Sequence, residues 1–60
     1  MKIEFETTNA AFGEEGDAGK FEFAEEIERI LLRIARLVDT GCTDGTIRDL
    51  NGNTVGSWAL

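Results

Sequence analysis

The stretch that decides the fold is FEFAEEIERILLRIARLVD, residues 21–39. Its apolar residues recur at spacings of three and four, which is typical of one face of an α-helix. They are Phe23, Ile27, Ile30, Leu31, Ile34, Leu37 and Val38, with Ala24 and Ala35 extending the stripe. Glutamates fill the first half and arginines the second, as the helix macrodipole favours, and Glu25 and Arg29 have the spacing of an ion pair. We predict one amphipathic helix over this stretch, ended by Gly41.

A short alternating segment precedes the helix. Apolar or small side chains in residues 2–7 alternate with charged ones, which predicts a half-buried strand. The side chains on its buried face are those of Ile3, Phe5 and Thr7. Residues 8–20 then carry three glycines among acidic residues, and this pattern predicts an irregular acidic loop. Within the loop, residues 10–12 have the composition of one short turn that would place Phe12 under the helix.

The last segment, residues 46–60, has the pattern of a β-hairpin. Asn51-Gly52 is a strong signal for a two-residue type I′ turn, because that turn needs positive φ at both central residues. The apolar residues of the two arms are Ile47, Leu50, Val55, Trp58 and Leu60. Gly56 interrupts the second arm, which indicates either a bulge or the close approach of another backbone. Trp58 is expected in the core, as a lid on the hairpin.

These elements predict an α+β fold of β-α-β-β order in a single domain spanning residues 1–60. The simplest packing is a three-stranded sheet with the long helix across one face. If the first strand lies beside the last, every strand pair is antiparallel, and we favour that order. On the helical wheel Leu32 lies well off the apolar stripe, so it is either a solitary exposed residue or part of a self-association surface.

Composition restricts the classes of function. Twelve acidic residues against six basic ones give a net charge of −6, which disfavours direct binding to nucleic-acid phosphates. Cys42 is the only cysteine and there is no histidine, so the chain can form neither an internal disulfide nor a zinc site of its own. Because sixty residues bury a small core, we expect a homo-oligomer, most simply a dimer. The lack of a signal-like or membrane-length apolar run predicts a cytoplasmic protein with no membrane partner.

Motifs for catalysis are weak throughout the chain. Without histidine or tyrosine no nucleophile–base pair can be assembled, so we predict that the protein is not an enzyme and assign no catalytic, cofactor-binding or metal-binding residue. Asp39-Thr40-Gly41 matches the aspartic-protease triplet, but its position favours a helix end. Asp49–Asn53 resembles the start of a calcium loop with its glycine misplaced, and a turn bonded by Asp49 and Asn51 side chains is the preferred interpretation.

The tail Ile47-Arg48-Asp49-Leu50-Asn51-Gly52-Asn53-Thr54-Val55-Gly56-Ser57-Trp58 resembles a recurring ending of small proteins encoded by bacteriophages and prophages. Residues 3–5, 8–12 and 30–35 fit the same pattern, so the resemblance covers most of the chain. It brings no catalytic residue. By analogy it implies a protein that occupies a host surface, as anti-CRISPR proteins do, or one that sequesters a cyclic-nucleotide signal of host defence.

Three hypotheses of function follow. The first is a phage accessory protein that inhibits a host defence component in an infected bacterium, docking an acidic surface on a basic host protein. The residues of that surface are Glu14, Glu15, Asp17, Glu22, Glu25 and Glu26. The second is an oligomeric sponge for a cyclic nucleotide, using Arg29, Arg33, Arg36 or Arg48 and stacking by Trp58. The third is a small homo-oligomeric assembly module that associates through Leu32.

Overall fold

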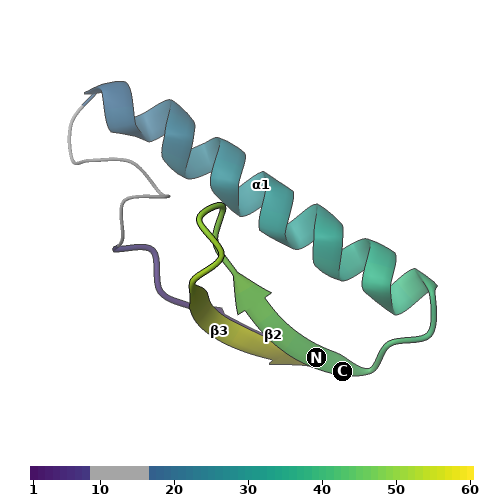
Figure 1. Ribbon diagram of the computed structural model, residues 1–60. Helices are drawn as coiled ribbons and strands as arrows, with labels where there is room; N and C mark the ends of the chain where they lie inside the picture. Colours follow the sequence, from purple (N-terminus) through teal and green to yellow (C-terminus); the bar gives the residue numbers. More distant parts are fainter. Residues whose placement is uncertain (9–16) are drawn as a thin grey trace.

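The computed structural model describes residues 1–8 and 17–60, with residues 17–21 described by their backbone alone. Its elements are β1 (Lys2–Phe5), α1 (Asp17–Asp39), β2 (Asp44–Arg48) and β3 (Thr54–Ala59). The strands form one antiparallel sheet in the order β1-β3-β2, and α1 lies across one face of it (Figure 1). The predicted α+β fold, its element order and the position of the first strand beside the last are therefore confirmed.

The core is formed between α1 and the hairpin of β2 and β3. Ile30 and Ile34 of α1 and Ile47 and Trp58 of the hairpin are buried against one another. Seven partly buried side chains surround these four: Ile3, Phe5, Ile27, Leu37, Val38, Cys42 and Val55. The alternation expected in the first strand is present, because Ile3 and Phe5 are half-buried while Lys2 and Glu4 are exposed.

The helix starts earlier than predicted. It begins at Asp17, so the segment expected to be loop up to residue 20 contributes its last residues to α1, and Gly19 lies within the helix. One glycine costs a helix only about 1 kcal/mol, which neighbouring helical residues can offset. The predicted turn at residues 10–12 lies outside the described residues.

The C-terminus of α1 is closed as predicted by Gly41, which has a φ of 101°. Its N–H donates to the Val38 carbonyl at 3.0 Å, and the N–H of Cys42 donates to the Leu37 carbonyl at 2.9 Å. This pair of bonds is the Schellman arrangement, which satisfies carbonyl groups left over at a helix end. Asp39-Thr40-Gly41 is thus part of a helix terminus.

The hairpin turn differs from the predicted type I′ turn. Within the described residues only Gly41 and Gly52 have positive φ, so Asn51 does not take the left-handed conformation that type I′ requires. Gly52 N–H donates to the Asp49 carbonyl, and Asp49 N–H donates to the Asn53 carbonyl. The connection therefore has three residues and ends in a left-handed glycine, the next most common hairpin geometry.

Gly56 sits at an irregularity of β3. Ile47 pairs with Gly56 and Arg48 pairs with Thr54, so Val55 is an extra residue in β3, which makes a bulge. A Cβ built on Gly56 would lie 1.9 Å from the Glu4 carbonyl oxygen and 2.5 Å from Phe5 Cα. Both interpretations offered for this glycine therefore hold.

Candidate functional site

A buried polar contact fastens α1 to the hairpin turn. Glu26 is 5% exposed, and its Oε2 accepts the N–H of Leu50 at 2.7 Å. Its other oxygen accepts a hydrogen bond from Nε of Arg29, and Nη2 of Arg29 donates to the Arg48 carbonyl at 3.0 Å. We call this set of contacts among Glu26, Arg29, Arg48 and Leu50 the latch. It ties the middle of the helix to the end of β2 and to the turn that follows.

The latch corrects two sequence-based expectations. Glu26 was expected on an exposed acidic surface, but burial against the hairpin removes its carboxylate from that surface. Arg29 was expected to pair with Glu25, yet it bonds to Glu26. Both glutamates are within reach of Arg29 along a helix. Glu26 is favoured because it also faces the hairpin, where a backbone N–H needs an acceptor.

The hairpin turn is held by Asp49, which is 4% exposed. One carboxylate oxygen accepts the N–H groups of Asn51 and Asn53 at 2.9 and 2.8 Å, and the other accepts Nδ2 of Asn53 at 3.2 Å. The sequence predicted a turn bonded by the side chains of Asp49 and Asn51. The Asp49 side chain makes such bonds, whereas Asn51 takes part through its backbone N–H. No cluster of three or more potential metal-ligating side chains occurs among the described residues.

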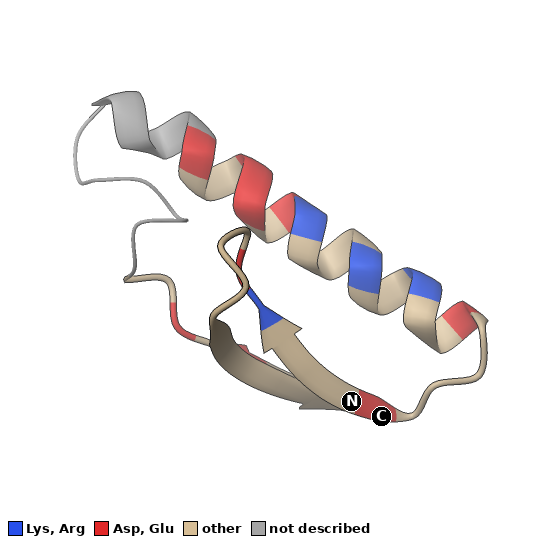
Figure 2. Ribbon diagram, viewed as in Figure 1, with Lys and Arg blue, Asp and Glu red and all other residues tan. Residues whose placement is uncertain are grey.

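The predicted acidic surface is placed only in part. Glu22 and Glu25 are exposed on the N-terminal half of α1, where acidic residues gather, whereas arginines follow in the second half (Figure 2). Asp17 is the first residue of α1. Glu14 and Glu15 lie outside the described residues, as does the side chain of Asp17.

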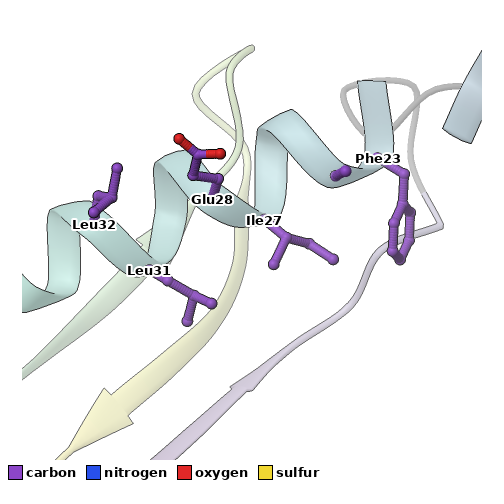
Figure 3. Close-up of a pocket in the computed structure, with 6 residues that line it drawn as sticks. Phe23, Ile27, Glu28, Leu31 and Leu32 are labelled. Atoms are coloured by element: carbon purple, nitrogen blue, oxygen red, sulfur yellow. The ribbon is translucent and has the colours of Figure 1, made fainter. Parts of the chain in front are cut away.

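An apolar groove lies beside the exposed glutamates. It is lined by Phe23, Ala24, Ile27, Glu28, Leu31 and Leu32 and has a volume of about 580 Å³. Phe23, Ile27 and Leu31 point to one side of α1, while Glu28 and Leu32 point to another (Figure 3). Phe23 and Leu31 belong to the predicted apolar stripe of the helix, yet they are 41% and 43% exposed. Leu32 is 55% exposed, as its off-stripe position suggested.

A second, polar pocket lies between α1 and the hairpin and has a volume of about 300 Å³. We call it the arginine pocket, because Arg29, Arg33 and Arg48 all line it. Its other lining residues are Ile34, Leu37, Thr46, Ile47, Asp49, Leu50, Gly52 and Trp58. The cyclic-nucleotide hypothesis uses these three arginines together with Arg36, and Arg36 does not line this pocket.

Trp58 is 2% exposed, as expected for a core residue. A ring at that depth has no free face for a base, so stacking of a nucleotide on Trp58 is ruled out. Its indole N–H is buried without a hydrogen-bond partner among the described residues. The ring lies against β2 at Gly45, where a Cβ would come within 2.8 Å of the indole nitrogen.

Fold and site together define a small β-α-β-β protein with an acidic helix half, an apolar groove and an arginine pocket. No protein-family model, curated protein or solved structure matches the chain. Within its described part, no helix has the length and apolarity needed to cross a membrane.

Leu32 on α1 gives a direct test of self-association. If two copies associate through this face of α1, we expect Leu32→Glu to lower the solution mass to that of the monomer, because a carboxylate buried in an apolar contact loses its hydration without gaining a partner. Leu50→Glu is the matched control, since Leu50 is 71% exposed at the hairpin turn, away from that helix face. Light scattering coupled to gel filtration measures both masses. If Leu32→Glu keeps the wild-type mass, the contact does not involve Leu32.

Proposed function

We propose that the protein is a phage-encoded accessory protein that binds and inhibits a host defence component, in the manner of anti-CRISPR proteins. The observation that carries this proposal is the exposed N-terminal half of α1, where Glu22, Glu25 and Glu28 stand near the apolar groove. Carboxylates around an apolar contact are suited to a basic protein surface, because the charges speed encounter while the apolar side chains contribute affinity. The resemblance of the tail to small phage proteins supports a partner in the bacterial host.

The mechanism is occupation of a basic surface that the host protein uses for nucleic acid. Glu22 and Glu25 are less than one helical turn apart, so their carboxylates present negative charge along one ridge, as neighbouring phosphates do. Glu26 is not part of this ridge, since its carboxylate is held in the latch. The proposed contact therefore comprises Glu22 and Glu25 with the apolar groove beside them, and Glu14, Glu15 and Asp17 extend it in sequence.

Charge reversal tests this mechanism. We expect the double variant Glu22→Lys/Glu25→Lys to weaken inhibition at least about tenfold, because two attractive contacts become repulsive. The readout is the plating efficiency of a CRISPR-targeted phage on an immune bacterial host that expresses the protein, compared with a host lacking immunity. Binding to the purified target should also weaken as salt is raised.

The matched control reverses two exposed acids of the sheet, Glu4→Lys/Asp44→Lys. Each reversal adds two charge units, so both double variants change the net charge from −6 to −2. If the sheet variant loses inhibition and the helix variant keeps it, the acidic half of α1 is not the contact. If the wild-type chain inhibits no defence system of the host, the proposed function itself fails.

A further inference from the structure

The arginine pocket concentrates positive charge in an acidic protein. The chain has six lysines and arginines against twelve aspartates and glutamates, and three of those six basic residues line this one pocket. Arg48 is the last residue of β2, and this end of the strand lies against α1, because Arg29 donates to the Arg48 carbonyl. Because like charges repel, such a convergence is unfavourable unless counter-charges offset it.

The three arginines are not equivalent. Arg29 is committed to the latch, where it bonds to Glu26 and to the Arg48 carbonyl. The side chains of Arg33 and Arg48 are exposed and form no ion pair or hydrogen bond with the described residues. Two arginine side chains without a bonded partner among the described residues, one on the helix and one on the hairpin, therefore line the same pocket.

The carboxylates near the pocket offset only part of its positive charge. Asp49 accepts bonds from the N–H groups of Asn51 and Asn53 and from the Asn53 side chain. Glu26 accepts bonds from Arg29 and from the N–H of Leu50. Both acids are thus engaged in holding the turn. The three arginines and these two carboxylates together leave one net positive charge at the pocket.

We propose that the arginine pocket binds a small phosphate dianion, as inorganic phosphate or as the terminal group of a phosphate monoester. Guanidinium groups match phosphate oxygens with paired N–H donors, which makes Arg33 and Arg48 suitable for opposite sides of one anion. A volume of about 300 Å³ is at the lower end for small-molecule sites, which favours a compact ligand. This site is separate from the acidic surface, so it extends beyond the proposed function.

Trp58 makes the proposal easy to test. It is the only tryptophan in a chain without tyrosine, and it lines the arginine pocket. Its fluorescence therefore reports on this part of the molecule without background from other residues. The indole N–H, which has no partner within the described residues, gives a second signal in ¹H–¹⁵N spectra.

The experiment titrates the full chain with inorganic phosphate at fixed ionic strength and follows Trp58 fluorescence and ¹H–¹⁵N shifts. We expect a saturable response in the wild type and at least tenfold weaker binding in both Arg33→Gln and Arg48→Gln. Arg36→Gln is the matched control, because Arg36 carries the same charge on the same helix but does not line this pocket. Its affinity should stay within twofold of the wild type, and circular dichroism verifies the fold of each variant.

Further titrations distinguish the sources of the phosphate. If adenosine monophosphate binds as tightly as phosphate, the site is one for phosphate monoesters. If only phosphate binds, the site is one for the free ion. Either result supports the proposal. If neither the fluorescence nor any chemical shift changes in a saturable way, the proposal is overturned. A response that chloride reproduces, or that Arg36→Gln loses as fully as Arg33→Gln does, overturns it as well, because general charge would then explain the effect.

Discussion

Gly56→Ala is expected to prevent the chain from folding. The added methyl group would lie 1.9 Å from the Glu4 carbonyl oxygen and 2.5 Å from Phe5 Cα, both of which are backbone atoms of β1. A side chain could rotate away from such a contact, but these atoms can move only if β1 leaves the central strand. We expect a cost of about 4 kcal/mol or more, which is comparable to the whole stability of a domain this small.

Two neighbouring substitutions calibrate that result. Ser57→Ala alters an exposed residue of the same strand and should change stability by less than about 0.5 kcal/mol. Gly45→Ala would meet the buried Trp58 ring, which is a side chain and not backbone, and should cost about 1–3 kcal/mol. Circular dichroism and Trp58 fluorescence rank the three variants. A folded Gly56→Ala variant as stable as Ser57→Ala would show that β1 does not approach Gly56 this closely.

The sequence predicts those parts of the fold that depend on local pattern. The spacing of apolar residues predicts α1, Gly41 predicts its end, and alternation predicts β1, because each signal lies within a few residues of its effect. Element order then restricts the packing to a sheet with one covered face. The start of α1 could not be predicted from local pattern, because a single glycine is a weak signal against a helix.

The parts that sequence cannot predict depend on contacts between distant segments. Glu25 and Glu26 are adjacent glutamates on one helix, and only the position of the hairpin decides that Glu26 is buried. Phe23 follows the helical spacing but is exposed, because α1 at about 34 Å is longer than the strands beneath it, the longest being about 20 Å. The arginine pocket is likewise assembled from two elements whose separation in sequence gives no sign of their proximity.

The latch makes Glu26 the polar side chain on which the packing of α1 against the hairpin most depends. Glu26→Ala would leave the N–H of Leu50 without its acceptor and Arg29 without its counter-charge in a partly buried site. Unpaired buried groups of this kind are costly, so we expect a loss of about 3 kcal/mol in the free energy of unfolding. Glu26→Gln keeps one acceptor oxygen for Leu50 and should lose about half as much.

Urea denaturation followed by Trp58 fluorescence measures these losses, with Glu25→Ala as the matched control on the same turn of α1. Glu25 is exposed, so its removal should cost less than about 0.5 kcal/mol. The difference between two adjacent glutamates isolates the latch from helix propensity and from net charge, which both variants change equally. Equal destabilisation by the two alanine variants would mean that Glu26 contributes only as one more charge on the helix, and that apolar packing alone holds the hairpin.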